Sequence, residues 1–363
     1  MAAALEAEEL VHVHGGEPGL RRERRGDGFV YIGPDGEPVQ DEATLARIRS
    51  LAIPPAWRDV WVALEDNAHL QATGLDARGR RQYLYHPAWR TRRDREKFDD
   101  MLAFAARLPG VRRTAATLLH SGEPGREPVL ALAVRLLDVG FFRIGWDRYA
   151  RDNGHVGLTT LRREHVTLLD GAVQFDYIAK SGKPRRMTVR DAQSVHALAP
   201  LKRRRGAPPE LLAYRAPGAT GRDGWRRIHA ADVNNAVRAW AEGPFSAKEF
   251  RTWAATVVAS VALAREQAAG HHGARSVSRA VRMVSTALGN TPSVARSSYI
   301  DPRVIDRYHR GSVIELPPDL PPAAVPLRID AGADGIVIEL PTEVDGDRLR
   351  LEVERRVLAL LTT

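Results

Sequence analysis

The sequence predicts an α+β protein with two lobes, a small β-rich N-terminal domain and a mainly α-helical domain that contains a small antiparallel sheet. Three observations predict this class. Short runs of β-branched and aromatic residues, separated by turn signals, dominate residues 28–91. Apolar residues recur at intervals of three and four over most of residues 92–315, and one group of alternating apolar residues interrupts that pattern. A chain of 363 residues is long enough to bury a core in each domain.

The N-terminal elements alternate strand-like runs with turn residues. Residues 1–27 mix Gly, Glu and Arg without a period and predict a mobile basic arm. The apolar run 29–32 and the turn after it predict a hairpin, and residues 44–48 predict a helix that ends before Pro54. Three further strands are predicted, at residues 61–64, 69–72 and 82–85. These patterns therefore predict that residues 28–91 form one sheet-rich domain.

Helical patterns dominate from the basic run at residues 90–97 onward, and we place the domain boundary there. Pro128 suits the first turn of a helix with apolar residues at helical spacing, and Gly140 follows its end. Three short strands predict the small sheet, at residues 155–161, 164–169 and 172–178. The next turn contains Lys180 and Lys183.

Two well-marked helices follow in the second domain. Ser246 and Glu249 form a capping box, and one apolar stripe comes after them. Residues 278–288 predict another helix, closed by Gly289 at a left-handed C-terminal position. We take residues 316–363, with one predicted strand and one predicted helix, as an acidic C-terminal appendage.

Charge is distributed unevenly along the chain. The net charge is +9, whereas residues 315–363 hold ten acidic side chains and five arginines, a net charge of −5. The rest of the chain is therefore strongly basic. Such a body favours a polyanionic partner, nucleic acid first, because phosphate contacts release counterions. A basic solvated surface on an unrelated enzyme explains the charge equally well.

Composition excludes several classes of protein. Without cysteine, the chain has no disulfide, no thiolate zinc site and no cysteine nucleophile. No apolar run approaches about 18 residues, and the acidic first ten residues lack the apolar core of a signal peptide. No P-loop pattern is present. We therefore expect a cytoplasmic protein with no membrane partner and no ATP-binding loop.

Six polar motifs follow one another along residues 82–315. They are Gln82-Tyr83-x-Tyr85, Phe142-Arg143-Ile144-Gly145 with Tyr149, the run 156–161 before His165, the turn with Lys180, Lys248-x-x-Arg251, and Gly289-Asn290-Thr291-Pro292-Ser293 with Tyr299. Singly, each of these residues is more often a surface or core residue. In this order and spacing, the motifs resemble the poxvirus-type, or small bacterial, branch of type IB DNA topoisomerases.

The resemblance implies a catalytic set. Arg143 and Arg251 would bind the scissile phosphate, since a guanidinium stays protonated and offers a rigid fork to phosphate oxygens. Lys180 would be the general acid for the leaving 5′ oxygen, with Lys183 as the competing candidate. Tyr299 would be the nucleophile and form a 3′-phosphotyrosyl link that retains the bond energy for religation. The resemblance implies no metal and no cofactor.

Asn290 departs from the family pattern, in which most members carry histidine at this place. Its amide can donate to a non-bridging oxygen, but it cannot be cationic or exchange a proton near neutral pH. We expect activity to be retained with weaker transition-state stabilisation. Judged by its local sequence alone, Asn290 is simply a residue that is tolerated just beyond the C-terminal end of a helix.

Candidate DNA contacts lie outside this set. Gln82 suits a base edge in the major groove, whereas tyrosine hydroxyls suit phosphate or sugar. Strand packing explains the strand residues equally well. The other candidates are Tyr83, Tyr85, Tyr149 and Lys248, with Arg78, Arg80 and Arg81 along backbone phosphates.

On this resemblance, the chain is a monomer that closes as a bilobed clamp around duplex DNA, relaxes positive and negative supercoils, and acts in the cytoplasm at the nucleoid. A tyrosine recombinase is the nearest alternative, since it uses a similar Arg, Lys, Arg and Tyr set. Recombinases typically carry histidine where this chain has Lys248, and a helical N-terminal domain. A non-catalytic DNA-binding protein would explain the charge but not the ordered nucleophile set.

Overall fold

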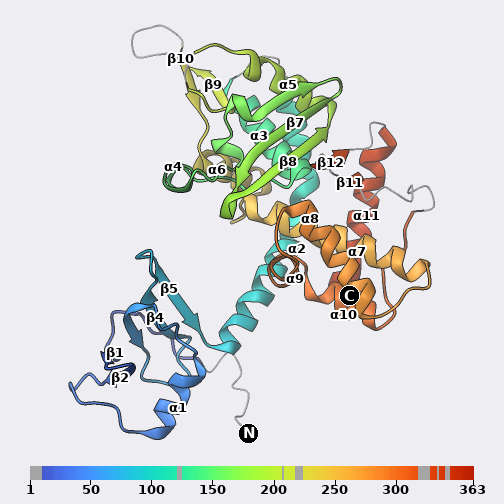
Figure 1. Cartoon of the computed structure of the whole chain (residues 1–363). Coiled ribbons are helices and arrows are strands. Elements are labelled where there is room, and N and C mark those ends of the chain that lie inside the picture. The colour runs from blue at the N-terminus through green and yellow to red at the C-terminus, as the bar shows by residue number, and fades with distance from the viewer. Residues whose placement is uncertain are drawn as a thin grey trace. The chain divides into compact units, whose positions relative to one another are not determined.

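The computed structural model describes residues 10–120, 125–206, 208–216, 224–317, 328–332, 335–339 and 344–363. The chain divides into two compact units, Met1–Asp99 and Asp100–Thr363. Figure 1 shows their elements, and the mixture of helices with sheets confirms the α+β class. None of the described helices combines the length and the apolar character that a membrane span requires.

The first unit is built on a five-stranded antiparallel sheet with the order β2-β1-β3-β4-β5. Its elements are β1 (Leu20–Arg25), β2 (Gly28–Ile32), α1 (Glu42–Ser50), β3 (Arg58–Val62), β4 (Leu70–Leu75) and β5 (Arg81–Tyr85). Asp41 caps α1 by accepting a hydrogen bond from the Thr44 amide. The predicted helix and the three later strands are thus present, with bounds shifted by a few residues.

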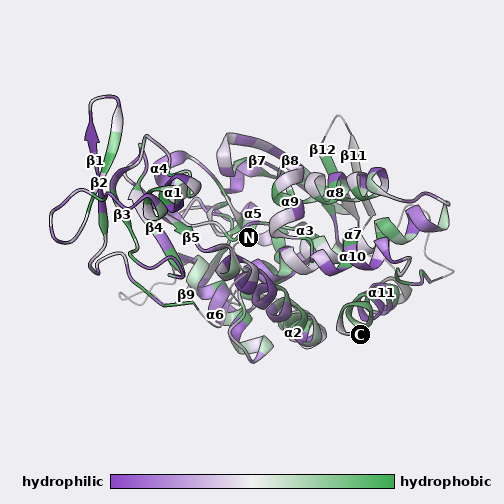
Figure 2. Ribbon diagram, turned by 90° about the horizontal axis from the view of Figure 1, so that it is seen from below, coloured by the Kyte–Doolittle hydropathy of each residue, from purple (hydrophilic) through white to green (hydrophobic). Residues whose placement is uncertain are grey.

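The basic segment expected to be a mobile arm instead contributes a strand from its described part. β1 pairs with β2 from Arg21↔Ile32 to Arg25↔Gly28. The predicted hairpin is also present in short form, since Ile32 bridges Pro38 and the Val39 amide donates to the Tyr31 carbonyl at 2.8 Å. β1 is almost entirely hydrophilic (Figure 2). Arg22 explains why such a strand is stable, because it donates to the Trp57 carbonyl at 2.6 Å and lies 4.1 Å from the Phe29 ring centre.

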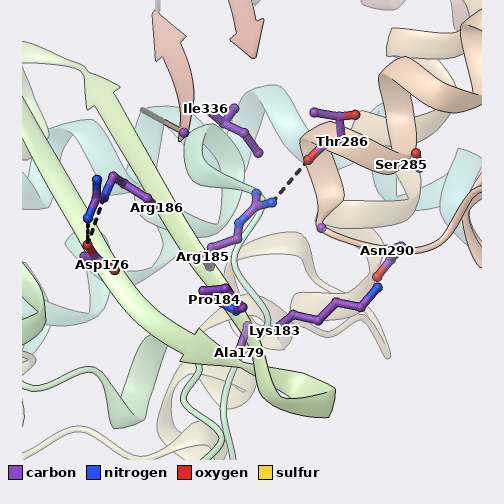
Figure 3. A pocket seen from close by; sticks show the side chains of 12 residues that line it. Asp176, Ala179, Lys183, Pro184, Arg185, Arg186, Ser285, Thr286, Asn290 and Ile336 are labelled. Carbon is purple, nitrogen blue, oxygen red and sulfur yellow. Dashed lines mark hydrogen bonds and ion pairs between the residues drawn. The ribbon is translucent and has the colours of Figure 1, made fainter. Parts of the chain in front are cut away.

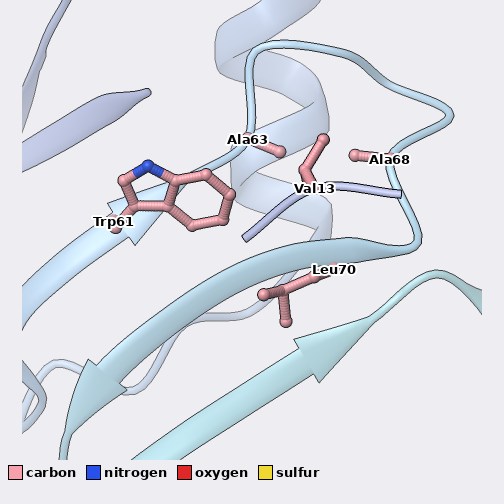
Figure 4. Packing of buried hydrophobic residues seen from close by; sticks show 5 residues of the cluster. All are labelled: Val13, Trp61, Ala63, Ala68 and Leu70. Carbon is pink, nitrogen blue, oxygen red and sulfur yellow. The ribbon is translucent and has the colours of Figure 1, made fainter. Parts of the chain in front are cut away.

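Both faces of this sheet bury apolar side chains, because successive residues of β3 point to opposite sides. Val60 and Val62 pack with Leu20, Ile48 and Ala72 on one face. The other face carries a second cluster, drawn in Figure 4, of Val13, Trp61, Ala63, Ala68 and Leu70. The Trp61 indole also donates to the Glu17 carbonyl at 2.9 Å. Residues before β1 therefore complete the core of the unit.

The helices of the second unit surround one buried helix. α2 (Pro87–Leu119) runs through the boundary between the units, so the basic run at residues 90–97 is helical. α7 (Ala247–Ala268) contacts α3, α6, α8, α10 and α11, and the capping box predicted at Ser246 begins it. The remaining helices are α3 (Arg126–Gly140), α4 (Asp147–Asn153), α5 (Ala192–Arg203), α6 (Ala230–Ala241), α8 (Ala274–Leu288), α9 (Pro292–Ser298), α10 (Pro302–His309) and α11 (Val344–Thr362).

The sheet of the second unit is larger than the sequence predicted. Its order is β11-β12-β8-β7-β6, and a separate pair joins β9 to β10. The strands are β6 (Val166–Leu169), β7 (Ala172–Ala179), β8 (Lys183–Arg190), β9 (Ala213–Ala216), β10 (Gly224–Arg227), β11 (Arg328–Gly332) and β12 (Gly335–Glu339). β6 and β7 are antiparallel, as expected. β8, which was not predicted, is antiparallel to β7, and β12 pairs with β8 in parallel. The strand predicted at residues 155–161 is wrong, since Leu158–Thr160 forms a 3-10 turn.

The described parts of residues 316–363 pack into this unit rather than forming an appendage to it. β12 extends the sheet, and α11 docks through a buried ionic cluster. Arg350 donates to Asp138 at 2.7 Å, Arg112 donates to the same carboxylate at 2.9 Å, and Arg112 also donates to Glu354 at 2.6 Å. Asp138, Arg350 and Glu354 are all at least nine-tenths buried. This cluster joins α2, α3 and α11.

We expect Asp138→Asn to lower the free energy of unfolding by about 3–5 kcal/mol, because it leaves the buried Arg350 and the partly exposed Arg112 without their shared carboxylate. Chemical denaturation measures this change. Glu42→Gln is the matched control, since its ion pair with Arg49 is exposed, and its stability should be unchanged. An unaltered unfolding curve for Asp138→Asn would show that the cluster contributes nothing.

The same carboxylate makes stability depend on pH. Burial raises the pKa of Asp138, but Arg112 and Arg350 outweigh burial and hold the pKa well below its usual range. A depressed carboxyl pKa stabilises the fold fully above the unfolded value of about 3.9. This stabilisation is lost as pH falls below that value toward the folded pKa. The acid limb of the stability curve should therefore be shallower in Asp138→Asn.

Candidate active site

Tyr299 lies at the C-terminal end of α9 and is half-buried. Thr291 caps this helix and Pro292 occupies its first turn, which accounts for its start in the run Asn290-Thr291-Pro292. On the other side, the Thr256 hydroxyl of α7 donates to the Tyr299 carbonyl at 3.4 Å and accepts from the Asp301 amide at 3.2 Å. α7 therefore fixes the backbone that carries Tyr299.

Arg251 projects from α7 beneath Tyr299. Its side chain is 4% exposed, and its guanidinium carbon lies 5.2 Å from the centre of the Tyr299 ring. It donates to the Phe141 carbonyl and, at 3.0 Å, to the Leu288 carbonyl. Burial and then the charge of Arg143 lower the pKa of Arg251 to about 10. Arg251 is therefore still a cation at neutral pH.

Arg143 lies on the loop after α3, and a close backbone contact sets its position. The Leu158 amide donates to the Arg143 carbonyl at 2.8 Å. Beside this bond two glycines touch, and a Cβ on Gly157 would lie 2.5 Å from the Cα of Gly145. The Arg143 guanidinium donates to the side-chain oxygen of Asn290. The Phe142–Gly145 and 156–161 motifs are thus parts of one loop contact.

The lysine turn joins β7 to β8. Lys180–Gly182 forms a single 3-10 turn, and both Lys180 and Lys183 are exposed. Lys180 contributes to lowering the pKa of Tyr299, whereas Lys183 extends toward Asn290 in Figure 3. Lys183 and Asn290 line the same pocket, of about 470 Å³. Lys183 therefore lies beside Asn290, and Lys180 is near enough to Tyr299 for its charge to act on the phenol.

The pKa of Tyr299 reflects these neighbours. Burial raises the pKa of the phenol, but the charges of Arg251, Arg143 and Lys180 outweigh burial and hold the pKa below its ordinary value of 10.0. A phenol in this setting deprotonates more readily than a free tyrosine. The four residues that the resemblance associates with cleavage are thus electrostatically coupled in one site.

Two buried donors in this site have no hydrogen-bond partner among the described residues. They are the Nδ2 of Asn290 and the Nε of Arg251. Asn290 follows Gly289, and its backbone amide donates to the Ser285 carbonyl at 3.0 Å. Buried donors of native proteins normally have a partner, so these two suit a bound anion.

Sequence reasoning missed one buried cation near the site. Arg185 of β8 is 7% exposed and reaches the C-terminal end of α8. It alternates with Met187 and Val189 as the inward residues of its strand. That alternation would have identified Arg185 if β8 had been predicted, but the strand is basic and contains Pro184.

The candidate DNA contacts of β5 differ in their surroundings. Tyr83 is 48% exposed and its ring stacks with that of half-buried Tyr85, 6.1 Å between centres. Gln82 donates to Asp76 at 3.0 Å, and Arg80 pairs with the same carboxylate at 2.7 Å. Gln82 and Arg80 therefore already have a protein partner.

The other predicted contacts are placed as follows. Arg78 and Arg81 are exposed, and so is Lys248 in the first turn of α7. Tyr149 belongs to α4, and its side chain lies outside the described part of the structure. His165 accepts a hydrogen bond from the Arg162 amide at 3.0 Å.

Comparisons with known proteins indicate the family of the chain. Residues 86–311 match the family described as eukaryotic DNA topoisomerase I, catalytic core. Residues 28–76 match the bacterial DNA topoisomerase IB, N-terminal domain. The DNA topoisomerase 1B of Acanthamoeba polyphaga mimivirus is 27% identical over 295 residues, which are 80% of this chain and 87% of that relative.

The chain belongs to the type IB DNA topoisomerase family. It is an isomerase that acts on DNA, with an N-terminal domain of the bacterial kind. The resemblance deduced from the six motifs is thereby confirmed.

We expect Gly157→Ala to slow DNA relaxation by about tenfold to a hundredfold, because its Cβ would push the Arg143 loop out of place. Plasmid relaxation at limiting enzyme measures this effect. Gly16→Ala is the matched control, since a Cβ there would have nothing within 4 Å. Equal rates for the two variants would show that the glycine contact does not position Arg143.

Proposed function

We propose that this enzyme relaxes positive and negative supercoils by cutting one strand of duplex DNA with Tyr299 and resealing it. The observation that carries this proposal is the convergence on Tyr299 of Arg251, Arg143 and Lys180, with unpartnered donors beside them. A tyrosine held among three cations suits attack on a phosphodiester, whose charge those cations would stabilise.

In the proposed cleavage step, the Tyr299 phenol oxygen bonds to phosphorus and the bond from phosphorus to the 5′ oxygen breaks. The phenol proton leaves to solvent, and Lys180 supplies a proton to the 5′ oxygen. Religation is the reverse, with the 5′ hydroxyl as nucleophile and its proton returned to Lys180. The 3′-phosphotyrosyl bond retains the energy of the phosphodiester, so the proposed cycle requires no ATP and no metal.

The unpartnered donors have a place in this step. The Nε of Arg251 and the Nδ2 of Asn290 would donate to the non-bridging oxygens, together with Arg143. Donors fixed before the reaction stabilise developing charge without further reorganisation. Asn290 would act as a neutral donor, which is weaker than a cationic histidine at the same place.

We propose that the DNA contacts outside the site include Tyr83, Tyr85, Tyr149, Lys248, Arg78 and Arg81. Gln82 and Arg80 would also contact DNA, but each must first leave Asp76. The enzyme would bind duplex DNA as a monomeric clamp, at the nucleoid in the cytoplasm. Sedimentation of the enzyme with a short duplex tests the stoichiometry, and one chain per duplex is the expected result.

Relaxation in EDTA without ATP tests the proposed reaction. Plasmids of either supercoil sign should relax, and denaturant should trap a covalent adduct. Proteolysis and mass spectrometry should then locate a nucleotide on Tyr299, joined to the 3′ end of the cut strand. Absence of relaxation under permissive salt, or an adduct on another residue, would reject the proposal.

Lys180 and Lys183 can be separated chemically. We expect Lys180→Ala to slow cleavage of an ordinary strand by about 10²–10⁴-fold, the usual contribution of a general acid. A sulfur in place of the leaving 5′ oxygen needs no protonation and should restore the rate. Lys183→Ala, in the same turn, is the matched control and should show no such rescue. If the sulfur substrate restores the rate only in Lys183→Ala, Lys183 rather than Lys180 is the general acid.

A further inference from the structure

One helix end in the active site is held by three arginines from three different elements. Arg185 of β8 donates to the Thr286 carbonyl at 3.2 Å and to the Ala287 carbonyl. Arg251 and Arg143 hold the residues that follow, through the Leu288 carbonyl and the Asn290 side chain. Of the three, only Arg185 has no part in the reaction proposed above.

Arg185 is buried without a carboxylate partner in the described part of the chain. Besides the Met187 sulfur, its acceptors are carbonyls at the C-terminal end of α8, where the helix dipole is negative. Figure 3 shows its side chain crossing from β8 to Thr286. Because a buried charge is costly without partners, these carbonyls compensate the guanidinium and tie the strand to the helix end.

Gly289 shows how closely Arg185 fits this helix end. The glycine has a φ of 64°, and a Cβ at this position would lie 2.7 Å from the Nη1 of Arg185. Asn290 comes directly after it. The side chain of Arg185 therefore packs against the backbone that orients Asn290 and leads to Tyr299.

Arg185 also lies close to the lysine turn. It pairs with Tyr177 across the hairpin, and it follows Lys183 by two positions. The tip of this hairpin, with Lys180, is exposed. A contact at Arg185 thus connects the base of the lysine hairpin to the segment that carries Asn290 and the nucleophile.

We propose that Arg185 is a positioning residue that sets the lysine hairpin against the end of α8, so that Lys180 reaches the leaving oxygen. The proposal rests on the assignment of Lys180 as general acid. Loss of the contact should impair protonation of the leaving group more than binding of DNA.

The test compares Arg185→Lys and Arg185→Met on two substrates, one with oxygen and one with sulfur at the 5′ position of the cleavage site mapped with the wild type. Lysine keeps the charge but cannot donate to two carbonyls with the same fork. On the substrate with oxygen at the 5′ position, the rate of single-turnover cleavage should fall by about tenfold to a hundredfold, because a small misplacement of a catalytic group such as Lys180 has an effect of this size. With sulfur, it should return to near the wild-type rate, while DNA affinity is unchanged.

Arg186→Lys is the matched control, because this neighbouring arginine is half-exposed and pairs with Asp176 across the hairpin. It should cleave both substrates like the wild type. Melting temperatures show which variants fold, and Gly289→Ala, which would displace Arg185 without removing it, replaces any that do not. Equal losses on both substrates, or no loss, would overturn the proposal.

Lys180→Ala, measured in parallel, shows which of two claims is wrong: the assignment of Lys180 as the general acid or the positioning role of Arg185. If the substrate with sulfur at the 5′ position does not restore the cleavage rate of Lys180→Ala, the assignment of the general acid is wrong, whatever the result for the Arg185 variants. If that substrate restores the cleavage rate of Lys180→Ala but not of the Arg185 variants, the assignment of Lys180 holds and the positioning role of Arg185 is wrong.

Discussion

A Tyr299→Phe enzyme should bind duplex DNA as the wild type does, yet neither relax it nor form a covalent adduct. The change removes the phenol oxygen that would attack phosphorus and leaves the ring that packs over Arg251. The fold should persist, since the contacts of this segment with Thr256 use backbone atoms. Gel shift and relaxation measure the two properties on the same plasmid.

Tyr308→Phe is the matched control for Tyr299→Phe. Its hydroxyl donates to the His271 carbonyl at 2.9 Å, so its removal costs one hydrogen bond, worth about 1 kcal/mol. This variant should keep full relaxation. Residual adduct in Tyr299→Phe would mean that another residue attacks the phosphate.

Replacement of Arg251 should have the next largest effect. Arg251→Gln removes the cation that packs on the Tyr299 ring and the donor left free at Nε, and we expect cleavage to fall by about 10²–10³-fold or more. Arg265→Gln, farther along the same helix and outside the site, should cleave like the wild type. Single-turnover cleavage measures both.

The pH profile gives a second measurement on Arg251. Its charge lowers the pKa of Tyr299, so its removal raises that pKa. A rate that depends on the phenolate rises with pH up to the pKa of the phenol. The rising limb of the profile should therefore move to higher pH in Arg251→Gln. An unmoved limb would show that Tyr299 is not the group that titrates.

Local signals in the sequence predicted several features correctly. The Ser246–Glu249 capping box begins α7, because its hydrogen bonds lie within four residues of one another. Gly289 ends α8 in the left-handed conformation expected of it. The motif residues Arg143, Arg251 and Tyr299 meet in one site, although their roles in catalysis remain predictions.

Long-range contacts account for what the sequence did not predict. Strand β8 has a basic sequence, and Arg185 is buried in it only because carbonyls of Thr286 and Ala287, a hundred positions away, accept its hydrogen bonds. Similarly, residues 155–161 alternate like a strand, yet Gly157 packs against Gly145 and their backbone bonds go to that loop. Neither set of partners is visible in a local window.

The parallel pairing of β12 with β8 has a mechanical consequence. In the proposed cycle, rotating DNA would pull on Tyr299 through its phosphate link. Ahead of Tyr299 in the chain, the end of α8 is attached to β8 by Arg185, and beyond it the chain returns to β8 through β12. The strand that supports the lysine turn would thus bear torque from both sides of the nucleophile, and the nucleophile and the proton donor would shift together under load.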